Sequence, residues 1–363
     1  MSDVIKCLVW DLDNTLWQGT LLEDGEVVLA DEIRDLVVEL DARGILQSVC
    51  SKNDHDQAWE RLEKLGVAEY FVLPQIGWGP KSEAVRSIAD RLQFAYRTIA
   101  FIDDQPTERA EVNYHLPEVR CYPAEQALAL TGLPEFTPAV VTEDSRGRRA
   151  MYQANFRRDA ERADFTGPDD EFLRTLDLAL EIQRARPQDL ARVAELTERT
   201  SQMNATGVHY SEEALRDLIG EPGHEVLVVS LSDRFGSHGA VGVILLARRP
   251  HAWHLRLLAT SCRVVSFGTG SVILRWLTDA AARAGVHLVA DFRPTGRNRM
   301  MEVAYRFAGF TTDSCDCADV PAAADVQLLH LPPAPQSPPG TMRVRVPVPF
   351  STAADTEWVR VDG

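Results

Sequence analysis

The sequence lacks any run of about 18 apolar residues, so it has no segment that could span a membrane as a helix. Its N-terminal stretch, MSDVIKCLVWDLDNT, is broken by charged residues within a few positions and leaves no room for a signal peptide. Cysteines number only 6 in 363 residues, which is too few for a disulfide framework. These absences predict a cytoplasmic protein in a reducing compartment, with no membrane partner.

Basic residues are scarce relative to acidic ones. Lys plus Arg number 38 and Asp plus Glu number 54, so the formal net charge is −16. This balance argues against a dedicated nucleic-acid-binding protein. The same negative field repels acidic proteins, so an acidic partner needs a local basic patch on this chain.

The rest of the composition is typical of a globular chain, and its length predicts two or three domains. Residues 1–130 alternate apolar runs with helical patterns. KCLVWDLD, ILQSVCS, YFVLP, TIAFIDD and VRCYP have the character of strands, whereas stretches such as DEIRDLVVELDAR have helical spacing. This alternation predicts βαβ units and a parallel sheet with functional side chains at the strand ends.

Three further parts are predicted after residue 130. Residues 131–185 start with Pro- and Gly-containing turns and continue as an Arg-rich helical linker. Residues 186–317 contain EVLVVSLSD, GAVGVILLARR and WHLRLLAT, which predict an antiparallel meander, and then a helix, a strand and a helix. Residues 318–363 include PPAPQSPPG and predict a loosely ordered tail with one strand at MRVRVPV.

Polar side chains suited to phosphoryl transfer follow the predicted strands of residues 1–130. They are Asp11, Asp13, Asn14 and Thr15 after the first strand, Ser51 after the second, Lys81 at a helix start, and Asp103 and Asp104 after a later strand. Each alone also fits a structural role, such as a helix cap or a solvated first-turn lysine. Together they predict one site, in which converging carboxylates need a cation such as Mg²⁺.

This ordered set resembles the haloacid dehalogenase (HAD) superfamily over residues 5–122. The resemblance implies a Rossmann-like parallel sheet in which Asp11 attacks phosphorus and Asp13 is the general acid–base. It implies that Ser51 and Lys81 bind the phosphoryl oxygens, with Asn14 and Thr15 also in the phosphate-binding set. It further implies that Asp11, Asp103, Asp104 and the backbone carbonyl of Asp13 hold Mg²⁺.

The spacing of these residues leaves no room for a large cap domain. Asp11 to Ser51 is 51 − 11 = 40 residues and Ser51 to Lys81 is 81 − 51 = 30 residues, and predicted elements fill both intervals. Only residues 16–28 are spare, enough for a hairpin flap. An open site of this kind favours a large substrate, or one delivered on a protein-tethered arm.

Four stretches give a closer resemblance. VWDLDNTLWQGTLLEDG, VCSKND, GWGPKSEAVRSIA and FIDDQPTERAEV resemble the FkbH-like glyceryl transferase/phosphatases of polyketide pathways, and with the second domain the resemblance covers roughly residues 1–315. It implies that the chain takes a phosphoglyceryl unit from 1,3-bisphosphoglycerate and removes its phosphate. The glyceryl group then passes as a thioester to an acyl carrier protein, in the supply of a methoxymalonyl-type extender unit.

Cys50 directly precedes Ser51 and is the candidate acyl-carrying nucleophile that the resemblance implies. Lys52 or Lys81 would favour its thiolate. The alternative is a small buried core residue, as predicted for Cys7 and Cys121. Cys315 and Cys317 lack the second pair that a zinc site needs.

Residues 186–317 resemble the GNAT acetyltransferase fold, an α+β domain that follows the capless HAD-like sheet. The stretch Arg263-Val-Val-Ser266-Phe-Gly268-Thr-Gly270 corresponds to the family's coenzyme A loop, with Ser266 in place of a glycine. Asn298 fits the next family segment. This groove would bind the pantetheine arm of the carrier, or the domain would be purely structural.

Three hypotheses follow: the glyceryl transferase/phosphatase, a capless Mg²⁺-dependent phosphatase with no acyl transfer, and an acetyltransferase with a vestigial HAD half. The altered coenzyme A loop disfavours the third. For docking of an acidic carrier, the candidate basic clusters are Arg146, Arg148, Arg149, Arg157 and Arg158, and Arg293, Arg297 and Arg299. The alternative is that these arginines pair with nearby acids.

Overall fold

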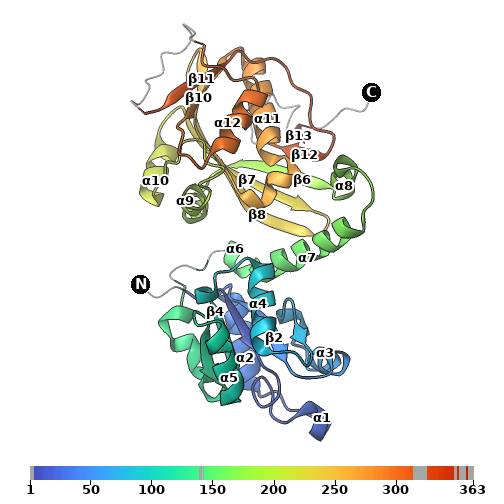
Figure 1. Ribbon diagram of the computed structural model, residues 1–363. Coiled ribbons are helices and arrows are strands. Elements are labelled where there is room, and N and C mark those ends of the chain that lie inside the picture. Colours follow the sequence, from blue (N-terminus) through green and yellow to red (C-terminus); the bar gives the residue numbers. More distant parts are fainter. Residues whose placement is uncertain are drawn as a thin grey trace. The chain divides into compact units, whose positions relative to one another are not determined.

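The computed structural model describes residues 4–138, 141, 143–313, 325–346, 350 and 357–358. The chain divides into two compact units, Met1–Phe156 and Arg157–Gly363. Figure 1 gives the labels of the elements used below. Among the described residues, no helix combines the length and apolar character needed to cross a membrane.

The described part of the first unit is built around a parallel sheet in the order β3-β2-β1-β4-β5. The strands are β1 (Cys7–Trp10), β2 (Leu46–Ser51), β3 (Gln75–Ile76), β4 (Ile99–Asp103) and β5 (Arg120–Pro123). The helices are α1 (Leu21–Asp24), α2 (Asp31–Ala42), α3 (His55–Lys64), α4 (Lys81–Leu92), α5 (Pro106–His115) and α6 (Glu143–Arg146), and η3 (Ala124–Gly132) is a 3₁₀ helix.

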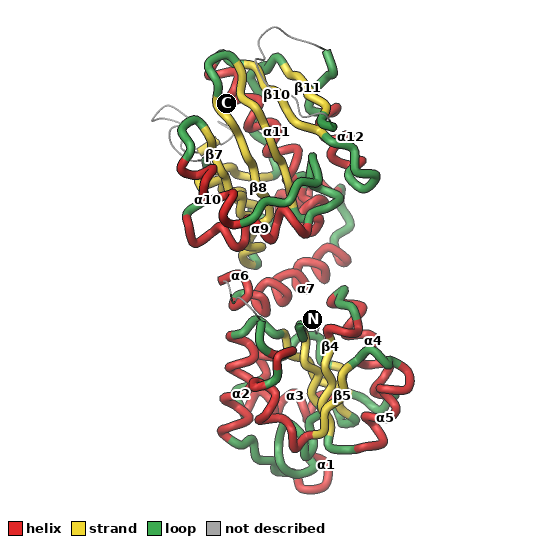
Figure 2. The backbone as a smooth tube through the Cα atoms, turned by 90° about the vertical axis from the view of Figure 1, so that its left-hand side faces the viewer, coloured by secondary structure: helices red, strands yellow, loops and turns green. Residues whose placement is uncertain are grey.

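The central strand β1 is buried on both of its faces because helices cover both sides of the sheet. Leu8 and Trp10 pack with α2 and α3, whereas Cys7 and Val9 pack with α4 and α5. In Figure 2 the strands of this unit lie between α2 on one side and α4 and α5 on the other. A strand buried on both faces is continuously apolar, as CLVW is.

The described part of the second unit is a mixed sheet in the order β11-β10-β9-β8-β7-β6-β12-β13. The strands are β6 (Leu178–Arg184), β7 (His224–Asp233), β8 (Gly236–Arg248), β9 (Ala252–Thr260), β10 (His287–Phe292), β11 (Gln327–Leu331), β12 (Met342–Arg345) and β13 (Glu357–Trp358). The helices are α7 (Arg148–Asp164), which begins in the first unit, α8 (Asp169–Thr175), α9 (Leu190–Arg199), α10 (Glu212–Gly220), α11 (Thr269–Ala284) and α12 (Arg299–Phe307).

The predicted meander is the centre of this sheet, because β7, β8 and β9 pair antiparallel in succession. Helices α11 and α12 cover one face of the sheet, and α9 and α10 cover the other. Strand β10 pairs parallel with β9 through only the first half of β9, from Ala252 to Leu255. The predicted fold class, a capless parallel α/β unit followed by an α+β unit, is confirmed in both parts.

The structure differs from the predicted boundaries in two places. The predicted linker 131–185 includes β6, which pairs with β7 over six residue pairs and belongs to the second sheet. The predicted tail 318–363 includes β11, which pairs with β10 and was not predicted, whereas β12 is the strand predicted at MRVRVPV and pairs with β6. Both errors have one cause: a short strand is held by partners distant in sequence, which local composition does not record. Cys315 and Cys317 lie outside the described residues.

A buried charged cluster closes the β7–β8 hairpin of the second unit. One carboxylate oxygen of Asp233, whose side chain is 0% exposed, accepts a hydrogen bond from Arg158 at 2.6 Å and lies 3.1 Å from His238 Nε2. Its other oxygen accepts the backbone N–H groups of Phe235 and Gly236. Burial alone raises the pKa of Asp233, but the bonds from His238 and Arg158 outweigh it and hold the pKa below its ordinary value.

We predict that Asp233→Asn destabilises the protein by about 3–5 kcal/mol, because it leaves Arg158 as a buried charge without its carboxylate. A carboxyl group whose pKa is lower in the folded than in the unfolded protein stabilises the fold at pH values above its ordinary pKa. This stabilisation is lost as the pH falls through the folded-state pKa. The difference between wild type and variant therefore narrows below about pH 4. The free energies of unfolding of wild type and variant are measured by urea denaturation at several pH values. Glu302→Gln, which removes an exposed pair with Arg306, is the control and changes stability by less than about 1 kcal/mol.

Candidate active site

Three parallel strands bring the main polar residues of the first unit to one edge of the sheet. Asp11 follows β1, Ser51 ends β2 and Asp103 ends β4. Each is almost fully buried, with exposed fractions of 5%, 3% and 0%. The backbone N–H of Asp11 donates to the carbonyl of Ile102, so the ends of β1 and β4 are locked together. The positions of these side chains therefore follow from the strand order.

Lys81 joins two of these carboxylates through its side chain. Its Nζ donates to Asp11 Oδ1 at 2.5 Å and to Asp103 Oδ2 at 2.5 Å. Burial opposes the charge on Lys81, but the two carboxylates outweigh burial and raise its pKa above the ordinary lysine value. Burial is also the largest influence on Asp11 and raises the pKa of its carboxyl, with Lys81 acting in the opposite direction. The site therefore holds a permanent cation between two buried carboxylates.

Carboxylate oxygens of Asp11, Asp103 and Asp104 all lie within 4.8 Å of one another. An all-oxygen set of this kind suits a hard divalent cation such as Mg²⁺. Thr15 braces the set, since its hydroxyl donates to Asp11 at 3.3 Å and accepts the backbone N–H of Asp104 at 3.0 Å. The residues present thus fit the predicted Mg²⁺ site, and Thr15 organises the carboxylates.

The carboxylate of Asp13 is held apart from this cluster by three donors. One oxygen accepts Trp17 Nε1 at 2.8 Å and the backbone N–H of Leu21 at 3.0 Å. The other accepts Asn53 Nδ2 at 2.9 Å. Asn53 is 1% exposed and was not among the predicted site residues. Its only signal in the sequence was its place in VCSKND, two residues after Ser51.

Asn14, which the sequence places in the phosphate-binding set, has a different role in the structure. It has a left-handed φ of 54° and is exposed. Its side-chain oxygen accepts the backbone N–H of Gly19, and its amide lies 3.5 Å from the hydroxyl of Thr20. These bonds close the turn that leads into α1. The structure thus gives Asn14 a turn-forming role, and its phosphate-binding role stays a prediction.

Cys50 lies next to this site but in an apolar setting. It is 2% exposed, packs with Val85 and Ile88 of α4, and its Sγ lies 3.8 Å from the carbonyl oxygen of Lys81. Burial raises the pKa of the Cys50 thiol to about 12, and the lowering effect of Lys81 does not offset it. Lys52 is engaged elsewhere, 2.7 Å from Glu108. The expectation that Lys52 or Lys81 makes a thiolate is not met in the resting protein.

Helix α5 supplies braces that the sequence analysis missed. Glu111 accepts the backbone N–H of Ser82 at 3.0 Å and also its hydroxyl, which fixes the first turn of α4 beside Lys81. Arg109 donates to the backbone carbonyl of Asp103 at 2.6 Å. Acidic residues near a helix N-terminus are favourable for that helix. The i, i+3 spacing of Glu108 and Glu111 on α5 was the signal available in the sequence.

The predicted coenzyme A loop forms the entry to α11 in the second unit. Residues Cys262–Phe267 form a 3₁₀ turn, and Gly268, with φ of 71°, starts the helix without a side-chain cap. Gly270 lies in the first turn of α11. Arg263 is exposed, and its Nε lies 3.3 Å from the hydroxyl of Ser261. The hydroxyl of Thr269 is buried with no hydrogen-bond partner among the described residues.

Asn298 does not line this loop but anchors the core of the second unit. It is 1% exposed, and its amide donates to the backbone carbonyls of Asn204, Ala205 and Arg293. Its side-chain oxygen accepts the N–H of Thr295. Because the protein's own backbone uses both ends of the amide, the predicted docking role of Asn298 is corrected to a structural one.

The arginines of the two predicted docking clusters differ in their exposure and in their bonding partners. Arg149 is paired with Asp41 at 3.0 Å, and Arg148 donates to the carbonyl of Gly44, so both brace the first unit. Arg158 is buried on Asp233. In the second cluster Arg297 and Arg299 are exposed, before and at the start of α12.

Comparisons with known proteins give partial matches. No family model and no curated protein matches the chain. The chain is similar to the N-terminal part of a Bacteroides fragilis protein, containing a phosphatase domain complexed with Mg. Their identity is 30%, with a TM-score of 0.31 and coverage of 33% of this chain and 36% of that one. The chain thus spans about a third of that protein's length.

The chain is also similar to two further solved structures. One is a HAD-superfamily hydrolase from Ehrlichia chaffeensis, with 13% identity, a TM-score of 0.27, and coverage of 33% of this chain and 87% of that one. The other is a GNAT-family acetyltransferase from Streptococcus pneumoniae, with 20% identity, a TM-score of 0.30, and coverage of 42% of this chain and 98% of that one.

We predict that Asp11→Asn lowers phosphate release from a small phosphate ester by at least about a thousandfold, since an amide cannot replace a carboxylate nucleophile. The two side chains are nearly isosteric, so the circular dichroism spectrum stays that of the wild type. Asp35→Asn, at an exposed position in α2, is the matched control. Retention of normal phosphate release by Asp11→Asn would exclude Asp11 as the nucleophile.

A second prediction concerns the resting thiols. At pH 8 iodoacetamide should label exposed Cys262 before Cys50, because burial keeps Cys50 protonated and shielded. Because Cys50 is 2% exposed and its pKa is raised, it should react at least about tenfold more slowly than Cys262. Peptide mass mapping over time measures both rates. Equal labelling of the two thiols would contradict the buried environment of Cys50.

Proposed function

We propose that the chain takes a phosphoglyceryl unit from 1,3-bisphosphoglycerate, removes its phosphate and passes the glyceryl group as a thioester to an acyl carrier protein. The substrate and the role in polyketide biosynthesis come from the resemblance of the sequence to FkbH-like proteins. By the same resemblance, the glyceryl thioester would be used to make a methoxymalonyl-type extender unit. The observation that carries the phosphatase half is the buried arrangement of Asp11, Lys81 and Asp103. The acyl-transfer half rests on Cys50 beside it.

In the phosphatase half, Asp11 attacks the phosphorus of the phosphate ester while Asp13 donates a proton to the departing hydroxyl oxygen. An aspartyl-phosphate forms on Asp11 as the ester O–P bond breaks. Water then hydrolyses it, and Asp13 accepts the proton that the water loses. Asn53 and Trp17 hold Asp13 in one orientation for both proton transfers. Lys81 balances the negative charge that gathers around Asp11.

Asp11, Asp103 and Asp104 would hold Mg²⁺, which supplies further positive charge toward the phosphoryl oxygens when it is bound. As the HAD resemblance implies, Asp13 would contribute its backbone carbonyl to the same metal site. By the same resemblance Ser51, which is buried at the end of β2, would bind a phosphoryl oxygen through its hydroxyl.

In the acyl half, Cys50 sulfur attacks the carbonyl carbon of the acyl phosphate. A thioester bond forms, the bond from that carbon to the phosphate oxygen breaks, and the thiol proton leaves with the phosphate. Because burial holds the pKa of Cys50 near 12, the thiol reacts only when bound substrate changes its surroundings or takes its proton.

The same burial favours the second candidate function, a capless Mg²⁺-dependent phosphatase with no acyl transfer. A cysteine that is 2% exposed and packed against α4 has the environment of a small core residue. The carboxylate and lysine arrangement serves both functions equally, so only covalent chemistry on Cys50 separates them.

The carrier would dock through exposed basic residues, because the chain carries a net charge of −16 and carriers are generally acidic. Arg297 and Arg299 are available for this purpose in the second unit. Arg148 and Arg149 already bond residues of the first unit, so docking at that cluster would compete with Asp41 and the carbonyl of Gly44. The entry to α11 at Gly268 and Gly270 is where the second unit would bind the pantetheine arm.

We predict that the intact mass of the wild type increases by a glyceryl group after incubation with 1,3-bisphosphoglycerate and Mg²⁺. Asp11→Asn should retain the phosphate and give an adduct heavier by one phosphoryl group. Cys50→Ala should give neither adduct and should still hydrolyse a small phosphate ester. If the wild type releases phosphate but never gains mass, the phosphatase alone is correct.

A further inference from the structure

Helix α12 of the second unit presents a row of apolar side chains to solvent, Met300, Val303 and Phe307, which we call the α12 stripe. Their exposed fractions are 50%, 42% and 88%. At about 100° of rotation per residue, the three positions fall within roughly 60° of arc around the helix. The buried residues Met301 and Tyr305 lie on the other side of α12 and pack in the core of the second unit. The α12 stripe is therefore not part of that core.

Exposed apolar side chains of this size are rare elsewhere in the described part of the second unit. The other one there is Ile219 on α10, a helix on the opposite face of the sheet. Single exposed apolar residues are ordinary on protein surfaces, whereas contiguous ones with a polar rim mark interaction sites. The α12 stripe thus has the character of a surface that a partner covers.

Exposed arginines flank the α12 stripe. Arg297 precedes α12, Arg299 is its first residue, and Arg306 lies in its last turn. Arg306 is paired with Glu302, but its side chain is still 73% exposed. A cation near a helix N-terminus opposes the helix dipole, so Arg297 and Arg299 do not stabilise α12. Instead they give this surface positive charge in a chain whose net charge is −16.

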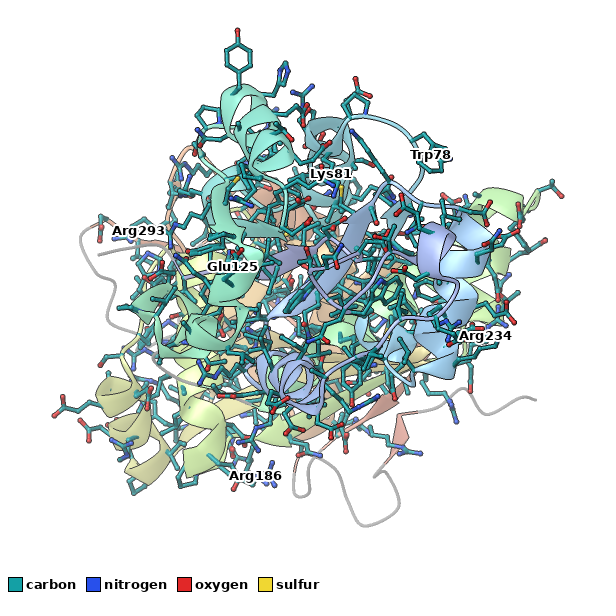
Figure 3. The ribbon with its side chains drawn as sticks, turned by 90° about the horizontal axis from the view of Figure 1, so that it is seen from below. Trp78, Lys81, Glu125, Arg186, Arg234 and Arg293 are labelled. Atoms are coloured by element: carbon teal, nitrogen blue, oxygen red, sulfur yellow. The ribbon has the colours of Figure 1, made fainter. Side chains whose placement is uncertain are left out.

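Arg293, the remaining member of the second predicted cluster, is engaged within its own unit. Its Nε donates to the backbone carbonyl of Thr206 at 2.7 Å, and its guanidinium pairs with Asp325 at 3.0 Å. Figure 3 shows Arg293 at the periphery of the view. The exposed basic charge of this cluster therefore lies beside the α12 stripe, at Arg297 and Arg299.

Charge distinguishes the partners that could cover this surface. In a symmetric dimer the same patch meets itself, so arginines would face arginines and the two chains would each carry −16. An acidic helix with apolar side chains complements both the arginines and the apolar row. The surface also meets the requirement that an acidic partner find a local basic patch on this negatively charged chain.

We propose that the α12 stripe and its flanking arginines dock the acyl carrier protein through an acidic helix of the carrier. This assignment rests on the proposed acyl-transfer function, which supplies the carrier as the partner. Phe307, the most exposed member of the stripe, is the apolar anchor of the contact. Arg297 and Arg299 steer the encounter.

The experiment measures the binding of an apo acyl carrier protein, which lacks the pantetheine arm, to the full-length chain. The variants are Phe307→Ser and Arg299→Glu, and the matched controls are Ile219→Ser and Arg216→Glu at exposed positions of α10. We expect Phe307→Ser to weaken binding at least about tenfold. Arg299→Glu should slow association and reduce its dependence on salt. Both controls should bind as the wild type does.

Thermal unfolding shows whether the fold itself covers the stripe. Phe307→Ser should unfold at the same temperature as the wild type, because its side chain is 88% exposed. A lower unfolding temperature would mean that the chain's own packing covers Phe307, which overturns the docking surface.

The remaining outcomes identify the partner. Normal carrier binding by both α12 variants, or equal weakening by the α10 controls, overturns the docking surface. Dimerisation that Phe307→Ser abolishes, or co-sedimentation with phosphatidylglycerol vesicles in place of carrier binding, overturns the carrier as its occupant. Failure of the proposed function is seen separately, as absence of a glyceryl mass gain on the wild type. In that case carrier binding that depends on Phe307 still supports the docking surface.

Discussion

The buried ammonium group of Lys81 between Asp11 and Asp103 is the interaction on which the first unit depends. Parallel strands that end at one edge of a sheet bring these carboxylates together, and their mutual repulsion in a water-excluded site is large. Lys81 relieves that repulsion through two bonds of 2.5 Å. The position of Lys81 depends on where α4 begins. Glu111 of α5 fixes that first turn by accepting hydrogen bonds from the backbone N–H and the hydroxyl of Ser82.

The same arrangement gives the site two chemically different sides. Toward Asp11, oxygen atoms and Lys81 form a polar region suited to phosphoryl transfer. Toward Cys50, the side chains of α4 form an apolar region that disfavours a thiolate. Each environment follows from which face of β2 a side chain occupies, because consecutive residues of a strand point in opposite directions. Cys50 thus shares the α4 side of the sheet with Leu46, whereas Val49 packs in the cluster on the other side.

Local patterns predicted the parallel sheet of the first unit because β1 and β4 are apolar runs and β1, β2 and β4 are each followed by helices, whereas β3 lies at Gln75–Ile76, just after the strand predicted at YFVLP. They failed for β6 and β11, which the sequence analysis assigned to a linker and a tail. Those strands join the sheet beside partners far away in the chain. In the site, strand-end positions predicted Asp11, Ser51, Lys81 and Asp103. The sequence analysis missed Asn53, which bonds Asp13, and Glu111, which bonds the first turn of α4, since these contacts link separate elements.

The sequence by itself determined the order of the strand-end residues, because alternating runs and helical periods specify where each strand stops. Tertiary structure decided what each side chain does there. In the folded chain the side-chain amides of Asn14 and Asn298 bond backbone groups of other residues. Asn14 therefore forms a turn, and Asn298 anchors the core of the second unit. It also enclosed Cys50 in apolar surroundings, because helix α4 covers that face of β2. Burial and hydrogen bonding between distant segments are properties of the folded chain, and only the fold assigns them.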